Sequence, residues 1–443
     1  MPARCRPALY LETFYNVGAG AFISLFLLSG VVLKTVIDGS AGHLALLAAM
    51  FGGSSLLSPL VSYCGRSIPM RTLVVVPNFI VALLLVATIS SYGGATFFAA
   101  VVGGAFIFRV FPRVSEMNMY RVLYPATHRG AAVGWIKAVS AIAALSVTVM
   151  GYWWFSFQPA YYWVPYWLVA ALLVGSALCY ARIPISRNNV FARAEQVAPH
   201  RAFWEGVRIF LSDRRFVMYQ IGFSFAGFAN HMAMIYVAQV LKEDVLEFRS
   251  LEQLVPGALR NLILVSWGLD RETVVTMIVG FIFAVLPVFL MMTSAPFWGR
   301  FLDRINPMSA RALFNSFQTV AYGLHAYGGL TLQVWPILLG AAIHAISNGG
   351  GTINWLTGSL YFARSEHTSL YNAVHVGLTG VRGMIAPIFG WYLYLDEIDL
   401  FGGAVRFKGA GLGAGMFWVA MGLSLLGAVF MFWQGLTDPG RRE

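Results

Sequence analysis

Long apolar runs alternate with short polar turns along almost the whole chain. Each run is long enough for a membrane-spanning helix, which needs about 20 mostly apolar residues. The pattern therefore predicts an all-α polytopic membrane protein with twelve transmembrane helices. The runs fall at 11–36, 42–64, 70–92, 95–117, 130–154, 161–182, 215–241, 273–298, 309–330, 333–361, 368–395 and 411–434.

A polar stretch separates the first six runs from the last six. It predicts an N-terminal six-helix bundle over 1–182, a cytoplasmic linker over 183–213 and a C-terminal six-helix bundle over 214–443. The only other long polar segment, 242–272, falls on the opposite side, and its role as a lid is left open. Four apolar residues at helical spacing predict a short amphipathic helix in the linker, lying on the membrane surface: Phe203, Val207, Phe210 and Leu211.

The basic residues give the chain an orientation in the membrane. With both termini placed in the cytoplasm, 20 of the 30 Lys and Arg residues fall on the cytoplasmic side and seven on the opposite side. The cytoplasmic set includes Arg113 and Arg311. Lys and Arg concentrate in cytoplasmic loops, so we expect a multi-pass protein of the cytoplasmic membrane with both ends inside. The net charge of +11 then reflects topology, and no nucleic-acid partner is expected.

The composition excludes several other classes of protein. Hydrophobic residues make up 58% of the chain and charged residues 11%, whereas soluble domains carry about 25% charged residues. The three cysteines, Cys5, Cys64 and Cys179, are scattered and have no metal-site spacing. The glycine run at 409–415 follows no predicted strand, so it does not indicate a dinucleotide site. We expect no enzyme, no catalytic residues, no metal and no cofactor.

One cytoplasmic turn carries a motif. Residues 299–307 read Gly-Arg-Phe-Leu-Asp-Arg-Ile-Asn-Pro, which resembles the G-x-x-x-D-R-x-G signature of the major facilitator superfamily. Asn306 stands where glycine is usual. The proposed cytoplasmic gate comprises Gly299, Asp303 and Arg304, in which the Asp303 carboxylate would pair with a basic residue or a helix N-terminus. The matching turn of the first half keeps Gly65 and Arg66 but has Ser62 in place of the aspartate.

The resemblance to the major facilitator superfamily implies a fold and a function. The fold would be two pseudo-symmetric six-helix bundles around a midplane cavity lined by helices 1, 4, 7 and 10. The function would be secondary transport of a small solute by alternating access, with protons or another ion as the coupling partner. We expect a monomer surrounded by membrane lipids. A transport-inactive scaffold or sensor with the same fold, and a lipid or lipophile flippase, remain as alternatives.

Charged residues inside the apolar runs are candidates for function because burying a charge in a bilayer is costly. Arg109, Lys137 and Arg382 are the deepest cations, whereas Glu12 and Glu116 are placed at cytoplasmic helix ends. The cavity is therefore expected to be net positive, which favours anionic or polar solutes. Structural roles stay open for two of them: Arg109 as part of a gate, and Lys137 reaching back to the cytoplasm.

Polar residues on the predicted helices complete the set of candidates. His231 and His344 lie on polar faces of helices 7 and 10, and Asn16 lies on helix 1. Protons, if they drive transport, would use Arg109 with a histidine such as His344. Asn348 belongs to a glycine-rich run, 347–352, which predicts either a broken helix or close helix packing.

Overall fold

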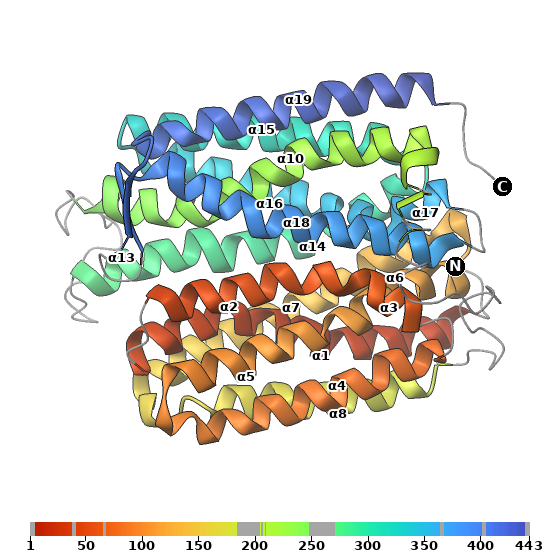
Figure 1. Ribbon diagram of the computed structural model, residues 1–443, viewed down its shortest axis with the longest axis horizontal. Coiled ribbons are helices and arrows are strands. Elements are labelled where there is room, and N and C mark those ends of the chain that lie inside the picture. Colours follow the sequence, from red (N-terminus) through yellow and green to blue (C-terminus); the bar gives the residue numbers. More distant parts are fainter. Residues whose placement is uncertain are drawn as a thin grey trace.

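Figure 1 shows the computed structural model of the chain, which is almost wholly helical. The structure describes residues 5–37, 41–64, 68–183, 204, 207–208, 210–247, 271–363, 367–400 and 405–438. Most of the predicted linker and most of the 242–272 segment lie outside these ranges, as do Gly65 and Arg66 of the predicted gate.

Helices α1 to α8 lie together in one group, drawn red to yellow in Figure 1. Some consecutive elements form one longer rod, in which an α-helix passes into a 3-10 or a π-helical segment. Their bounds are α1 (Arg6–Val31) with η2 (Val32–Val36), α2 (Ala41–Gly53) with η3 (Ser54–Leu57) and α3 (Ser58–Cys64), α4 (Met70–Val86) with η4 (Ala87–Gly93), α5 (Ala95–Phe108) with α6 (Val110–Leu123), α7 (Arg129–Phe157) and α8 (Val164–Ala181).

Helices α10 to α19 form the second group, drawn green to blue. Their bounds are α10 (Arg214–Gln239) with η7 (Val240–Leu246), α13 (Arg271–Gly280) with η9 (Phe281–Val285) and α14 (Leu286–Leu302), α15 (Pro307–Leu330), α16 (Val334–Thr357), the short α17 (Ser359–Phe362), α18 (Thr368–Tyr394) and α19 (Met416–Thr437).

Within the described ranges these helices make twelve rods, and the predicted all-α fold with twelve spans is confirmed. Nine spans in the same ranges are long and apolar enough to cross a membrane. The rest of the set is the broken rod of α2, η3 and α3, together with α15 and α16. These last two helices carry buried polar side chains that lower their hydropathy, among them Asn315, Gln318, His344 and Asn354.

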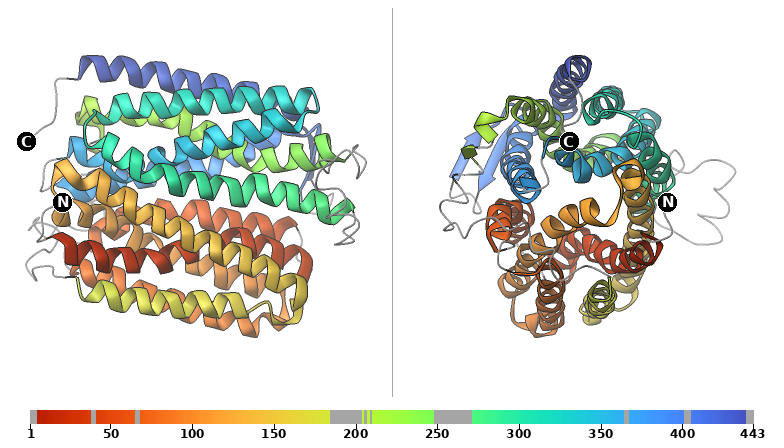
Figure 2. Two further views of the ribbon diagram at one scale, coloured as in Figure 1. Left: turned by 180° about the vertical axis from the view of Figure 1, so that it is seen from behind. Right: turned by 90° about the vertical axis from the view of Figure 1, so that its right-hand side faces the viewer.

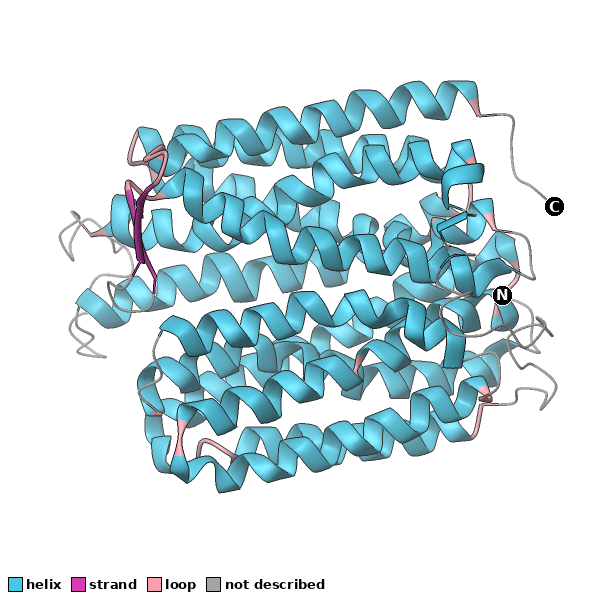
Figure 3. Cartoon of the chain, viewed as in Figure 1, coloured by secondary structure: helices cyan, strands magenta, loops and turns pink. Residues whose placement is uncertain are grey.

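One small element was not predicted. Strands β1 (Glu397–Leu400) and β2 (Val405–Lys408) pair antiparallel, with Glu397 opposite Lys408. Figure 3 shows this hairpin at one end of the bundle, between α18 and α19. Both strand sequences alternate charged and apolar residues with a period of two, which suits a strand and not a spanning helix.

The start of α1 and the end of α19 lie at the opposite end of the bundle from the hairpin (Figures 1 and 2). We call the two ends the terminal end and the hairpin end. Seen along the rods in Figure 2, the helices of the first group and those of the second occupy different halves of the molecule. Helix α7 packs against α14, and α2 against α18, so each group contributes to the contact between them.

Glycines bring α7 and α14 together near the terminal end. A Cβ atom added at Gly130 would collide with the carbonyl oxygen of Gly299, and one added at Gly299 would collide with that of Gly130. Next to them, a Cβ at Gly134 would lie 2.6 Å from the Ala295 carbonyl oxygen. Small residues are needed wherever two membrane helices approach this closely.

Enlarging this crossing is expected to destabilise the protein. Gly299→Ala should lower the free energy of unfolding by about 1–3 kcal/mol, the usual cost of overpacking. The measurement is thermal unfolding of the purified protein in detergent. Gly175→Ala on α8 is the matched control, since a Cβ there meets nothing within 4 Å. Equal effects of the two substitutions would contradict the close crossing.

Candidate functional site

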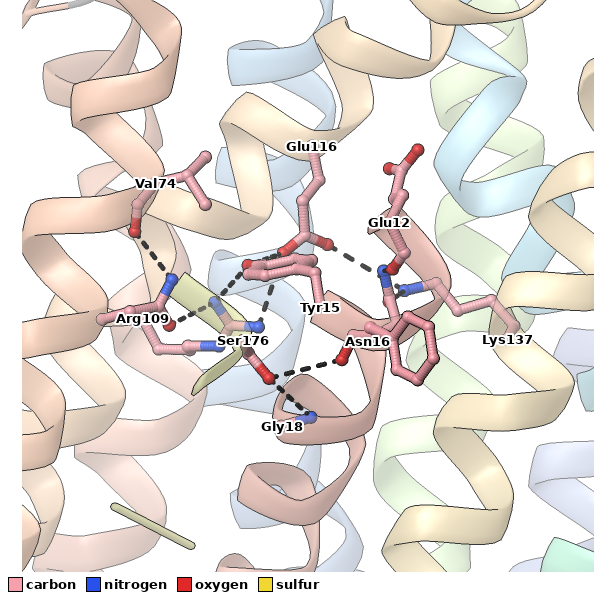
Figure 4. A network of polar contacts seen from close by, with 11 residues as sticks. Glu12, Tyr15, Asn16, Gly18, Val74, Arg109, Glu116, Lys137 and Ser176 are labelled. Carbon is pink, nitrogen blue, oxygen red and sulfur yellow. Dashed lines mark hydrogen bonds and ion pairs between the residues drawn. The ribbon is translucent and has the colours of Figure 1, made fainter. Parts of the chain in front are cut away.

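Buried charges of the first group meet in one network, which we call the N-terminal cluster (Figure 4). Arg109 Nη1 donates to Tyr15 Oη at 2.8 Å and to Asn78 Oδ1 at 3.1 Å. Arg109 Nη2 lies 3.4 Å from Glu116 Oε1, and Lys137 Nζ lies 4.0 Å from Glu116 Oε2. The Tyr15 hydroxyl also donates to Glu116. Glu116 is therefore the hub that holds two cations together.

The local sequence explains how Arg109 and Glu116 come to face one direction. The two residues are seven positions apart, about two helical turns, so they share a face. The helix is interrupted at Arg109, between α5 and α6. Pro112 has no N–H to donate to the carbonyl oxygen four residues earlier, at Phe108, and this loosens the helix at that point.

Two carboxyl groups of this region are buried. Glu12, in the second turn of α1, and Glu116, in the middle of α6, are 0% and 4% exposed. Two carboxyl groups therefore accompany Arg109 and Lys137, and the expected net positive charge of the cavity stays a prediction. The position of a residue along a helix does not give its burial, which depends on the neighbouring helices.

Glu12 differs from Glu116 in having no cation among its described ion-pair partners. Its Oε2 accepts from the Tyr124 hydroxyl at 2.6 Å, while its Oε1 is buried with no hydrogen-bond partner. Asn16, one turn along α1, accepts from Lys137 Nζ at 3.0 Å. Asn16 and Arg109 thus belong to one network, as candidates of the same site, and Glu12, Tyr15 and Glu116 join them.

A second set of buried side chains, the arginine cluster, lies in the other group of helices. Arg382 on α18 donates from Nη1 to Ser224 Oγ and from Nη2 to Thr379 Oγ1, both at 2.8 Å. The Arg311 guanidinium on α15 lies 3.9 Å from the centroid of the Phe223 ring, and that of Arg382 lies 5.2 Å from it. One aromatic ring therefore serves two buried cations.

Aromatic and polar side chains extend the arginine cluster toward the first group. The Trp355 indole donates to Thr379 Oγ1 at 3.1 Å, and His375 Nδ1 lies 3.0 Å from Gln220 Oε1. Arg113, from α6 of the first group, places its guanidinium 4.4 Å from the Trp355 ring centroid. The arginine cluster thus touches a cation of the opposite half.

The histidine candidates lie elsewhere. His344 is 1% exposed, neither ring nitrogen has a hydrogen-bond partner, and its ring lies 5.5 Å from that of Tyr322 inside the second group. Arg109 bonds to Tyr15, Asn78 and Glu116, and makes no described contact with His344; a joint role of the two residues in proton coupling stays a prediction. His231 and Asn348 are half-buried, on α10 and α16 respectively.

The glycine run of α16 does not break the helix. The helix is continuous from Val334 to Thr357, so the prediction of a broken helix is wrong here and close packing explains the glycines. A Cβ at Gly349 would collide with Ser294, and one at Gly350 would collide with Phe314.

The predicted gate residue Asp303 lies where α14 ends. Its two carboxylate oxygens accept from the backbone N–H groups of Gly130 at 2.7 Å and Ala131 at 3.0 Å, at the start of α7. A carboxylate is favoured there because unpaired N–H groups and the helix dipole make a helix N-terminus positive. Burial raises the pKa of Asp303, and the two amide hydrogen bonds oppose the rise. Arg304, beside it, is exposed.

Further hydrogen bonds join the two groups of helices on this side. Arg121 Nη1 donates to the Ala363 carbonyl at 2.9 Å and to Thr368 Oγ1 at 2.6 Å. Asn372 Nδ2 donates to Asn118 Oδ1 at 2.6 Å. With the Asp303 contacts, these bonds tie the halves together toward the terminal end.

Sequence reasoning missed Arg311 because it lies four residues into α15 and next to an arginine-rich turn. A signal was present, since polar residues recur along one face of this otherwise apolar helix at i, i+4, i+7 and i+14. All are at most 5% exposed: Arg311, Asn315, Gln318 and His325.

Comparison with known proteins gives the fold a name. No family model matches the sequence, and no curated protein matches it. Solved structures do match, with 11–12% sequence identity, and the matches cover 97% of this chain. They include the proton:xylose symporter XylE bound to 6-bromo-6-deoxy-D-glucose (TM-score 0.68, 12% identity, 96% of that chain). FucP in the outward conformation also matches, with a TM-score of 0.67, 12% identity and 98% of that chain covered. The human organic anion transporter MFSD10 matches with a TM-score of 0.68, 11% identity and 100% of that chain covered.

The chain therefore has the fold of the major facilitator superfamily, as the 299–307 motif indicated, and it is a multi-pass membrane protein.

Proposed function

We propose that the protein is a secondary transporter that moves a small polar or anionic solute across the membrane by alternating access. The observation that carries this proposal is the presence of a buried charged cluster in each half of a major facilitator fold. Each membrane-buried charge costs about 2.5–3.5 kcal/mol on insertion scales. A fold that keeps Arg109, Glu116, Lys137, Arg311 and Arg382 in its interior therefore has a use for them.

The two groups of helices would be the moving parts. In this proposal the bundles 1–182 and 214–443 rock against each other about the linker at 183–213. The excess of arginines in the turns favours a cytoplasmic location for the terminal end. The hydrogen bonds of Asp303 and Arg121 would then hold the cytoplasmic side closed, and their release would open it.

Proton coupling would use the N-terminal cluster instead of His344. Glu12 has a buried carboxyl oxygen with no partner, and Glu116 lies between two cations. A carboxyl group in such a place changes the local charge balance by one unit when it gains or loses a proton. That change would alter how firmly α1, α6 and α7 are held together through Tyr15, Glu116 and Lys137.

Reconstitution into liposomes tests the proposal. Purified protein is assayed with a panel of labelled sugars and carboxylates, under proton and sodium gradients in both directions. We expect gradient-dependent accumulation of at least one solute and its loss when an ionophore removes the gradient. Liposomes without protein serve as the control. Movement of no solute under any gradient would instead favour the scaffold alternative.

A further inference from the structure

We propose that the arginine cluster is the binding site for an organic oxyanion, a carboxylate or phosphate head group attached to an apolar body. The inference rests on the proposed transport function and names its substrate class. It starts from Arg311, which is 5% exposed and forms neither a hydrogen bond nor an ion pair with any described residue. Its one described polar interaction is with the face of Phe223.

A buried guanidinium N–H without an acceptor is unfavourable because it loses its water and gains no partner, and Arg311 Nε is such a group. Arg382 is partly satisfied by two hydroxyl groups, but its Nε is buried without a partner. Gln220 Nε2 is also buried and unpartnered. Unused donors therefore occur on α10, α15 and α18 within one cluster.

The charges of the cluster indicate the charge of a ligand that it would bind. The described ion pairs are those of Glu116 with Arg109 and Lys137, and that of Arg215 with Asp438. Arg311 and Arg382 have none, so two positive charges share one ring without a carboxylate. The planar guanidinium fork matches the two oxygens of a carboxylate or phosphate, which makes an oxyanion the complement.

The walls of the cluster fit the rest of the ligand. Phe223, Trp355 and the His375 ring are neighbours, with 4.9 Å between the ring centroids of Phe223 and His375 and 5.6 Å between those of Trp355 and His375. Glycines leave room for the arginines: a Cβ at Gly227 would lie 3.1 Å from Arg382 Nε, and one at Gly351 would lie 3.4 Å from Arg311 Nη1. Aromatic faces beside paired cations suit an acid with an apolar body.

The site also connects the two halves. Arg113 of the first group lies on the Trp355 ring and adds a third cation at its edge. An anion held by Arg311 and Arg382 would attract Arg113, so binding would draw the halves together. This gives the ligand a difference in affinity between the closed and open arrangements, which a transported substrate needs.

Thermal unfolding of the full chain in detergent, at fixed ionic strength, tests the site. The probes are benzoate and phenyl phosphate, with benzamide as the uncharged counterpart of benzoate. We expect benzoate or phenyl phosphate to raise the melting temperature in a saturable way, and benzamide to leave it unchanged. Arg311→Gln and Arg382→Gln should each weaken the apparent affinity by about 10- to 100-fold, the loss of a charge-assisted hydrogen bond.

Two control variants separate the site from general charge. Arg300→Gln removes an equal charge from an exposed position and should bind as the wild type does. Arg382→Lys keeps the charge without the fork and should bind more weakly than the wild type. Equal stabilisation by benzamide, no stabilisation by either anion, or equal weakening by Arg300→Gln would overturn the proposal. The wild-type comparison of benzoate with benzamide applies even if a variant does not fold.

Failure of the anion site and failure of the transport function are distinguishable. Uptake of a neutral sugar by protein that binds neither anion would support the transport function and contradict the anion site. Anion binding by protein that moves no solute would support the anion site and contradict the transport function.

Discussion

Glu116→Gln is expected to destabilise the protein by about 3–5 kcal/mol, because it leaves Arg109 and Lys137 in the interior without a counter-charge. The carboxylate is 4% exposed and lies within 3.4 Å of one cation and 4.0 Å of the other. The amide keeps the size of the side chain but removes the charge. The measurement is the unfolding midpoint in detergent, together with the yield of folded protein.

Two comparisons show whether the loss comes from the charge. Glu12→Gln changes a carboxyl group of the same cluster that has no described cation partner, and should cost markedly less. Adding Lys137→Met to Glu116→Gln removes one of the stranded cations and should recover part of the lost stability, as expected for coupled sites. If Glu12→Gln and Glu116→Gln behaved alike, Glu116 would not be the hub of the cluster.

Arg109→Ala is expected to abolish concentrative uptake. The guanidinium joins Tyr15 on α1, Asn78 on α4 and Glu116 on α6, so its removal disconnects three helices and leaves Glu116 with Lys137 at 4.0 Å. The measurement is solute accumulation by reconstituted protein, corrected for the amount folded. Lys137→Gln, which leaves the Arg109 contacts in place, should reduce accumulation less. Unchanged accumulation by Arg109→Ala would refute the role given to this residue.

The spans were predictable because burial in a membrane leaves a strong signature in sequence. Apolar runs of about twenty residues and arginine-rich turns between them show almost directly where each spanning helix lies in the sequence. The paired strands 397–400 and 405–408 were not predicted because they are short and fall between two spans. The continuity of α16 through Gly349 and Gly350 could not be predicted either, because glycine is common both at helix breaks and at close helix contacts. The close contact is seen only when the neighbours Ser294 and Phe314 are placed.

Only part of the candidate site could be predicted from the sequence, for a different reason. Arg109 and Arg382 stand out because they interrupt apolar runs. Glu12, Glu116 and Arg311 lie nearer to turns, and their burial depends on neighbouring rods that the sequence does not place. The pairing of charges is a property of packing between helices far apart in the chain, and single-helix periodicity carries no information about it.

Movement between the two halves is the central claim, and a reversible cross-link tests it most directly. Asn118 and Asn372 come from different halves and their side chains meet at 2.6 Å. Cysteines at these two positions, in a chain without Cys5, Cys64 and Cys179, are joined by a short disulfide-forming reagent. The matched control joins positions 43 and 96, since His43 and Thr96 lie 2.9 Å apart within the first half.

Alternating access predicts that joining the Asn118→Cys and Asn372→Cys positions stops uptake, that reduction restores it, and that the His43→Cys and Thr96→Cys pair has no such effect. Full uptake by protein whose two halves are cross-linked would contradict the account.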